Sequence, residues 1–185
     1  MKAQIHPHAI VETSHIGDDT RIWAFVHILE NVRIGNNCNI CDHCFIENNV
    51  TIGNNVTIKS GVYIWSGTVI EDDAFIGPNV VFTNDLRPRS KKKFDLKKIT
   101  VSKGASIGAN STLLAGITIG RYAMSGIGSV ITRDVKDQEL VFGNPARHQG
   151  WLDENGEKLL RKGKEWISVS GTRYLETEKG LQRIA

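Results

Sequence analysis

Residues 34–77 read IGNNCNICDHCFIENNVTIGNNVTIKSGVYIWSGTVIEDDAFIG, and isoleucine occupies every sixth position of this stretch. The same spacing runs without a gap from Ile10 to Ile76, and Phe82 takes the next place. It stops over residues 83–100 and then resumes with Val101, Ile107, Leu113, Ile119, Ser125 and Ile131. A repeat of this regularity determines the architecture before any single element is considered.

A period of six residues excludes an α-helix, whose period is about 3.6 residues. It fits a short strand followed by a sharp corner, and many isoleucines are followed by Gly, Asn or Asp, which accept the unusual backbone angles of corners. A second series, four positions after each isoleucine, holds small or β-branched residues such as Val32, Cys38 and Ala74. We expect both series to face inward, three units to close a triangular coil, and coils to stack about 4.8 Å apart.

The predicted fold is therefore all-β: a left-handed parallel β-helix of about six coils over residues 1–136, with a protruding loop at 83–100. Residues 137–185 lose the repeat and contain a turn-rich stretch, FGNPAR, at 142–147. A solenoid needs covered ends. We expect residues 137–185 to form a C-terminal turn and a segment that caps the last coil.

The composition is that of an ordinary soluble globular protein, with 185 residues, 23% of them charged. A net charge of +3 is too small to indicate a nucleic-acid-binding protein. The N-terminus does not read as a signal peptide, and no apolar run approaches the roughly 20 residues of a membrane span. We expect a cytoplasmic protein without a membrane span.

The cysteines Cys38, Cys41 and Cys44 are three in number, which favours free thiols. Cys38 and Cys44 belong to the inward series and are expected to fill the core, whereas Cys41 faces outward. Because zinc needs converging ligands, the alternation of these faces predicts no metal site here.

Outward residues that lie 18 positions apart should stack on one face of the coil. Asn48, Ser66 and Asn84 form such a polar column beside the start of the loop, with Glu47 and Trp65 next to it. We interpret this column as the wall of a ligand-binding cleft. The alternative is a solvent-exposed face on which asparagine forms corners. The lysines at 91–93 and 97–98 in the loop are either solvated or attract a phosphate-bearing ligand.

Four stretches carry a resemblance to a known family: GVYIWSGTVIEDDAFIGPNVVFTND at 61–85, PRSK at 88–91, GASIGANST at 104–112, and GNPAR at 143–147 followed by Gly150 and Trp151. Over roughly residues 5–152 the chain resembles the hexapeptide-repeat N-acetyltransferases of nucleotide-linked 3-amino sugars. The resemblance implies direct transfer of an acetyl group from acetyl-CoA to the sugar's 3-amino group, without a metal. It also implies a homotrimer with sites between subunits.

The resemblance places Asn84 at the amine, which it would orient, and makes Ser66 the second catalytic candidate. The family often has Asp or Glu at position 66, so a carboxylate-assisted step is in doubt unless Glu47 substitutes. The substrate-binding candidates are His27, Glu47, Asn48, Trp65, Asp85 and Arg89. His27 is either a base or substrate ligand, or a surface or interface residue.

The resemblance also implies that the acetyl-CoA arm runs along the later coils, between subunits. Backbone amides at the tight turns around Ala115, Gly116, Gly126 and Ile127 would bind the pantetheine, and Arg133 and Arg147 would bind the phosphates. Ser125 and Ile127 stand where the family has an aliphatic residue and an alanine, so we expect a reshaped pantetheine groove.

Two branches of the family remain open. One acts on dTDP-3-amino-3,6-dideoxyhexoses for O-antigen or other surface glycans, and the other acts on UDP-2-acetamido-3-amino-2,3-dideoxyglucuronate. Asp85 after Asn84, and the sequence Tyr-Ile-Trp at 63–65, favour the dTDP branch.

Three other classes of protein could share a repeat of this kind. An acyltransferase for serine or an antibiotic would share the repeat. A zinc carbonic anhydrase on this fold needs three converging histidines, and the six histidines lack that spacing. A non-catalytic β-helix binding module would leave the loop and the polar column unexplained.

Overall fold

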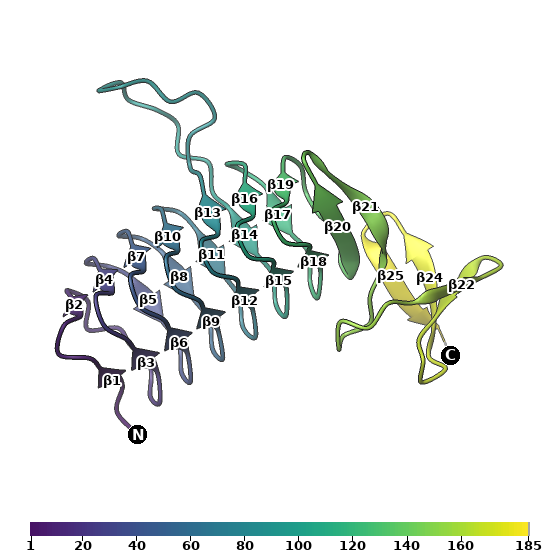
Figure 1. Cartoon of the computed structure of the whole chain (residues 1–185), viewed down its shortest axis with the longest axis horizontal. Coiled ribbons are helices and arrows are strands. Elements are labelled where there is room, and N and C mark those ends of the chain that lie inside the picture. The colour runs from purple at the N-terminus through teal and green to yellow at the C-terminus, as the bar shows by residue number, and fades with distance from the viewer. Residues whose placement is uncertain (185) are drawn as a thin grey trace.

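The computed structural model describes residues 1–184 and shows a prism of short parallel strands (Figure 1). Each coil contributes one strand to each of three faces, so strands three apart in the chain pair side by side over most of the prism. The described residues contain strands and no helix. The chain is the left-handed parallel β-helix that the six-residue repeat predicts.

The three faces are three sheets, here called A, B and C. Sheet A contains β1 (Gln4–Ile5), β3 (Arg21–Ile22), β6 (Asn39–Ile40), β9 (Thr57–Ile58), β12 (Phe75–Ile76), β15 (Ser106–Ile107), β18 (Met124–Ser125), β20 (Glu139–Gly143) and β21 (Ala146–Trp151). Sheet B contains β2 (Ile10–Val11), β4 (His27–Ile28), β7 (Phe45–Ile46), β10 (Tyr63–Ile64), β13 (Val81–Phe82), β16 (Thr112–Leu113) and β19 (Val130–Ile131). Sheet C contains β5 (Arg33–Ile34), β8 (Thr51–Ile52), β11 (Val69–Ile70), β14 (Thr100–Val101) and β17 (Thr118–Ile119).

The core is a set of stacked side chains, one from each short strand. In sheet B, Ile28, Ile46 and Ile64 pair in register from coil to coil, and each is fully buried. Most of the series four positions later is also buried, as Val32 and Cys38 show. Full burial of one such aliphatic side chain contributes about 1.5–3 kcal/mol, so this repeated stack supplies most of the hydrophobic stabilisation.

The corners are held by a second ladder, made of side-chain amides and carboxylates. The Asn36 backbone N–H donates to Asn54 Oδ1 at 2.8 Å, and the Asn54 N–H donates to Asp72 Oδ1 at 2.6 Å. The next corner residues, Asn55 and Asp73, have φ of 57° and 62°. Asn and Asp tolerate this left-handed conformation better than other non-glycine residues, which explains their repetition in the sequence.

The first coil departs from the predicted register. Ile10 pairs with His27 and Val11 pairs with Ile28, so Val11 takes the core place and Ile10 is 59% exposed. The prediction that Ile10 faces inward is wrong, because the first coil is one residue shorter than the 18-residue spacing between Ile46 and Ile64.

The interrupted coil is longer than its neighbours by one insertion. Phe82 pairs with Leu113, 31 residues later instead of 18, so 13 residues are inserted. Ile99 is buried in the core and Thr100 begins β14. The predicted loop interval of 83–100 is therefore too wide, because Ile99 already belongs to the inward series.

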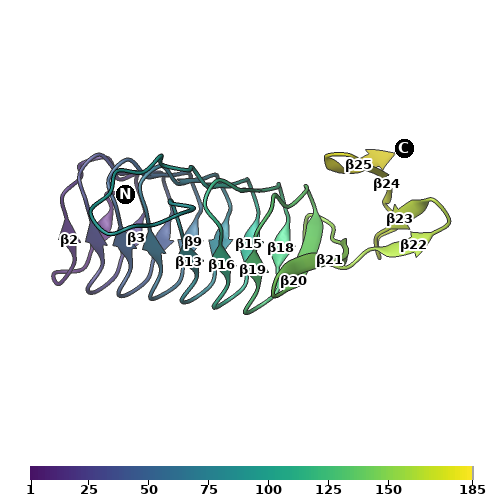
Figure 2. The ribbon, with the colours of Figure 1, turned by 90° about the horizontal axis from the view of Figure 1, so that it is seen from above.

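The C-terminal residues extend sheet A and then form a separate sheet. β20 pairs in parallel with β18 and antiparallel with β21. Beyond them, β22 (Leu160–Lys162), β23 (Glu165–Ile167), β24 (Arg173–Thr177) and β25 (Gly180–Ile184) form an antiparallel sheet D past the end of the prism (Figure 2). Trp151 of β21, Leu159 and Tyr174 form a second, small core in this C-terminal region. Within residues 1–184 there is no helix of the length and hydropathy that a membrane span requires.

The thiols allow a test of the inward series. Burial raises the pKa of the Cys44 thiol to about 11, and burial also raises the pKa of Cys38. Because the thiolate is the reactive form, a thiol reagent at pH 8 should modify the half-buried Cys41 first, and the other two only after unfolding. Cys41→Ser should then remove the rapid phase, and rapid labelling of Cys44 in the native protein would contradict the packing.

Candidate active site

At the corner between sheets B and C, each coil has one residue two positions after the core residue, and all of these except the buried Ala115 are at least partly exposed. The strand register places these residues in a single column, called here the loop corner: Asn48, Ser66, Asn84, Ala115 and Arg133. The predicted polar column is thus part of a longer line that continues past the loop. Consecutive coils are about 4.8 Å apart along it.

Ser66 and its neighbours are linked by hydrogen bonds. The Ser66 hydroxyl donates to Asn48, whose backbone and side-chain oxygens lie at 2.8 and 3.0 Å. The Ser66 backbone N–H donates to Glu47 Oε2 at 2.8 Å. The Glu47 carboxylate therefore lies against the backbone of position 66.

The loop leaves the prism at Asn84 and returns at Lys97. The Asn84 carbonyl oxygen accepts the Lys97 N–H at 2.9 Å, which closes the base of the loop. Leu96 packs against Gly67, where φ is 83° and a Cβ would lie 2.3 Å from Leu96 Cδ2. The glycine at position 67 therefore makes room for the returning strand of the loop.

Beyond its base, the loop stands away from the prism and extends toward the N-terminal coils, as Figures 1 and 2 show from two directions. Asp85 and Arg89 lie on this segment. Asp85 Oδ1 accepts the Arg87 N–H at 2.8 Å, and the Arg89 guanidinium donates to the adjacent Pro88 carbonyl at 2.9 Å. Asp85 thus shapes the exit turn, and Arg89 is exposed and separate from the polar column.

His27 projects from sheet B, on the same side of the prism. Its Nε2 lies 2.7 Å from Glu12 Oε1, and both side chains are more than a third exposed. His27 thus lies two coils before Ser66 and contacts the first coil through Glu12, a partner that was not predicted from the sequence. The missing residue of the first coil brings Glu12 into reach of His27.

The outward face of sheet B carries further aromatic rings beside the loop corner. Phe45 lies between His27 and Tyr63, with ring centroids 5.6 and 6.4 Å away. Trp65, half-buried at the corner, has its ring 5.8 Å from Phe45 and 6.5 Å from Tyr63. Phe45 and Tyr63 were not among the predicted site residues, although their 18-residue spacing in the sequence places them on one face.

The residues predicted for the acetyl-CoA arm fall on two different corners. Ala115 and Gly116 lie at the loop corner, where a Cβ on Gly116 would be 3.4 Å from Lys97 Cβ. Gly126 and Ile127 follow β18 and lie at the opposite edge of sheet B, with Ile127 81% exposed. Ser125 faces the core, where its hydroxyl accepts the Gly108 N–H at 3.0 Å. The expectation that Ser125 reshapes an outer groove is wrong for this reason.

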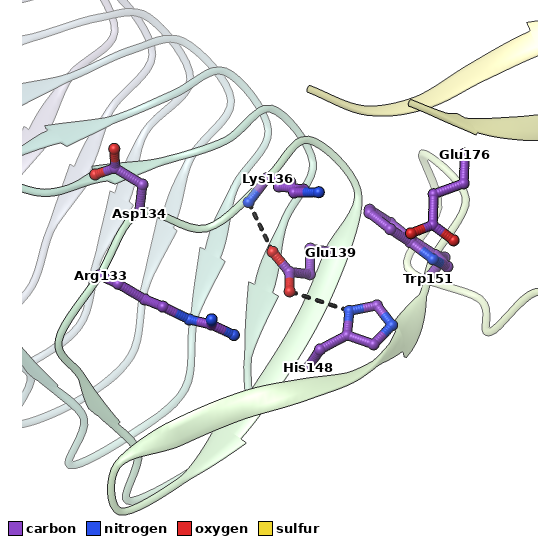
Figure 3. A pocket seen from close by; sticks show the side chains of 7 residues that line it. All are labelled: Arg133, Asp134, Lys136, Glu139, His148, Trp151 and Glu176. Atoms are coloured by element: carbon purple, nitrogen blue, oxygen red, sulfur yellow. Dashed lines mark hydrogen bonds and ion pairs between the residues drawn. The ribbon is translucent and has the colours of Figure 1, made fainter. Parts of the chain in front are cut away.

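Arg133 ends the loop-corner column at a hollow of about 240 Å³ between the last coil and the C-terminal segment (Figure 3). There the buried Glu139 carboxylate accepts the Lys136 N–H at 2.8 Å and lies 3.0 Å from His148 Nδ1. Trp151 also lines the hollow, and its buried indole N–H has no partner among the described residues. Arg147 lies in β21 and donates to the Ala146 carbonyl oxygen at 3.2 Å. The described residues contain no cluster of three or more His, Cys, Asp or Glu suited to a metal ion.

Comparisons with known proteins agree with this architecture. The family model described as bacterial transferase hexapeptide (six repeats) matches residues 13–48 and 49–84. The hexapeptide repeat of succinyl-transferase matches residues 31–66 and 98–133. The second model thus matches on both sides of the loop.

One curated relative matches almost the whole chain. It is the dTDP-3-amino-3,6-dideoxy-alpha-D-galactopyranose 3-N-acetyltransferase of Aneurinibacillus thermoaerophilus, 59% identical over 171 residues, which cover 92% of this chain and 89% of that protein.

Solved structures support the fold. A mutant of AntD, an N-acyltransferase from Bacillus cereus in complex with dTDP and coenzyme A, superposes with a TM-score of 0.58 at 21% identity, covering 83% of this chain and 84% of that chain. The acetyltransferase domain of PglB from Neisseria gonorrhoeae, in complex with acetyl coenzyme A, superposes with a TM-score of 0.58 at 17% identity. The match covers 80% of this chain and 58% of that chain.

Proposed function

The chain belongs to the hexapeptide-repeat N-acetyltransferases of nucleotide-linked amino sugars, and we propose that it moves acetyl from acetyl-CoA to the 3-amino group of a dTDP-3-amino-3,6-dideoxyhexose. The observation that carries the proposal is the 59% identity over 92% of the chain to an enzyme of that name. That relative favours the dTDP branch over the UDP-glucuronate branch and the galacto configuration of the sugar.

We propose Asn84 as the residue that holds the amine. It lies where the repeat breaks, between the column of Ser66 and Asn48 on one side and the loop on the other. Its side-chain oxygen can accept one amine N–H while the nitrogen lone pair stays free to attack. Such an arrangement accelerates the reaction mainly by proximity and orientation.

The chemistry of the proposed step needs no residue that becomes covalently modified. The amine nitrogen attacks the thioester carbonyl carbon, the tetrahedral intermediate expels the CoA thiolate, and the proton lost by nitrogen passes to that sulfur. Ser66 is engaged as a donor to Asn48, and the Glu47 carboxylate accepts a backbone N–H. Their proposed role is to support the bound sugar, together with Asn48 and Asp85, while Arg89 on the loop meets the phosphates and Trp65 contacts the nucleotide part of the substrate.

The loop corner offers a path for the cosubstrate. Ala115 and Gly116, directly past Asn84 in the column, leave little side chain between the loop base and the prism. Arg133 lies one coil further, at the hollow beside His148. We propose that acetyl-CoA follows this line from Asn84 to Arg133. Gly126 and Ile127, on the other edge of sheet B, and Arg147, in β21 of sheet A, would act on a neighbouring subunit's cosubstrate.

That arrangement requires a neighbouring subunit, and we propose a homotrimer with its sites between subunits. We also propose that residues 1–136 form the catalytic prism and that residues 137–185 cap its C-terminal end. Because acetyl-CoA and nucleotide sugars are cytoplasmic metabolites, we propose a cytoplasmic enzyme that serves the synthesis of O-antigen or another surface glycan.

A thiol-release assay tests the function. With acetyl-CoA and dTDP-3-amino-3,6-dideoxygalactose, we expect one free CoA thiol for each sugar acetylated. The matched control is dTDP-6-deoxygalactose, which has a hydroxyl in place of the amine and should release none. Absence of thiol release with every 3-amino nucleotide sugar would refute the proposal.

Asn84→Ala should lower kcat by about 100-fold or more, as expected when a group that orients the reactants is lost. The fold should persist, because Asn84 lies outside the core and its loop contact uses the backbone oxygen. The measurement is steady-state kinetics beside a circular dichroism spectrum. Unchanged turnover would remove Asn84 from the mechanism.

His27→Ala should retain most of kcat, because the imidazole is paired with Glu12 at 2.7 Å and lies two coils away from Ser66. Glu12→Gln, which changes the partner alone, should behave in the same way. A loss of about 1000-fold in His27→Ala, on the scale of general-base removal, would show that the histidine accepts the amine proton.

A further inference from the structure

The aromatic patch on sheet B has no role in the acetyl transfer itself. It consists of Phe45, Tyr63 and Trp65, with His27 at its N-terminal end, and each ring contacts the next with centroids 5.6–6.5 Å apart. The interplanar angles between His27 and Phe45, and between Phe45 and Tyr63, are 74° and 80°, so these neighbours meet edge to face. In edge-to-face packing the edge of one ring meets the face of the next, so neighbouring rings are not stacked face to face.

The patch is open and is confined to one face of the prism. Tyr63 is 53% exposed and the adjacent Val81 is 48% exposed. Outward positions on sheet C are filled by Arg33, Thr51, Val69, Thr100 and Thr118, none of them aromatic. Sheet A has one aromatic outward residue before the C-terminal strands, Phe75, on β12. Phe45 and Trp65 are half-buried beside the exposed Tyr63, so the three rings form one apolar surface that a ligand can reach rather than scattered apolar residues.

The position of the patch relative to Asn84 fits the length of a nucleotide sugar. Phe45 belongs to the coil of Asn48, which lies two coils before Asn84 in the loop-corner column, a separation of about 10 Å along the prism. A nucleoside diphosphate places roughly this distance between its base and the sugar attached to its far phosphate. A sugar held at Asn84, with its nucleotide directed toward the N-terminal coils, would bring the base to Phe45, Tyr63 and Trp65.

The positive charge of the loop is complementary to the diphosphate, which would lie between Asn84 and Phe45. Residues 85–98 contain seven basic and two acidic side chains, a net charge of +5, which exceeds the +3 of the whole chain. Figure 1 shows the loop extending back from the end of β13 over the coils that carry β4, β7 and β10. A diphosphate lying between Asn84 and Phe45 would thus be attracted by the overhanging basic segment.

We propose that Phe45, Tyr63 and Trp65 form the subsite for the pyrimidine base of the nucleotide-linked sugar, with the base packed against these rings. The proposal rests on the function given above and adds the direction of the substrate, with the base toward the N-terminal coils and the amine at the break in the repeat. Sequence-tolerant stacking on aromatic side chains is a recurrent mode of base binding.

The test compares Phe45→Ala with Phe75→Ala, because both remove a phenyl ring that precedes an inward isoleucine in a two-residue strand. Phe45→Ala should raise the KM for the nucleotide sugar about tenfold, within the usual strength of base stacking. The kcat and the KM for acetyl-CoA should stay within about twofold, because the base is bound equally in the ground and transition states. Phe75→Ala should change none of these values, and Phe45→Tyr should restore the KM.

A second readout does not depend on turnover. Calorimetric titration with dTDP alone should show binding to the native protein and about tenfold weaker binding to Phe45→Ala. If the native protein binds dTDP but releases no thiol, the proposed function fails while the base subsite stands. Equal dTDP affinity of the native, Phe45→Ala and Phe75→Ala proteins would overturn the subsite, as would a smaller molecular mass of Phe45→Ala in solution, which would assign the patch to a contact between subunits.

Discussion

The stacking of one aliphatic side chain per strand, coil over coil, is the constraint on which the rest of the structure depends. Each of Ile46, Ile64 and Phe82 is buried between the equivalent residues of adjacent coils, so an extra residue within a strand would displace every later core residue. Only the corners tolerate insertion without breaking the stack. The 13 inserted residues leave and re-enter at one corner, and the pairing of Phe82 with Leu113 restores the register immediately.

That constraint also explains why the candidate site lies where it does. Because the coils stack in register, outward residues far apart in the sequence form straight columns with about 4.8 Å between members. The column of Ser66, Asn84 and Ala115 passes under the base of the loop, where the Asn84 carbonyl accepts the Lys97 N–H. A rigid scaffold with one long loop is a common way to build a binding site. Here the stacked coils hold the polar side chains at a fixed spacing along the prism.

The periodic features could be predicted from the sequence, because the period carries them. The prism, the inward isoleucines and the polar column of Asn48, Ser66 and Asn84 all follow from spacings of 6 and 18 residues. The shortened first coil could not be predicted, since nothing in the sequence marks the missing residue that exposes Ile10 and pairs His27 with Glu12. The contacts among Phe45, Tyr63 and Trp65 depend on side-chain rotamers, and the hollow beside His148 depends on how the aperiodic C-terminal strands fold back.

Acetyl transfer in this account depends on position rather than on an acid–base residue, so its central claim concerns where the amine is held. The direct measurement is a crystal structure with CoA and dTDP-3-amino-3,6-dideoxygalactose. The account predicts the 3-amino nitrogen about 2.6–3.2 Å from the Asn84 side-chain oxygen, at the foot of the loop. A sugar bound elsewhere, such as in the hollow beside His148 with Asn84 facing solvent, would contradict it.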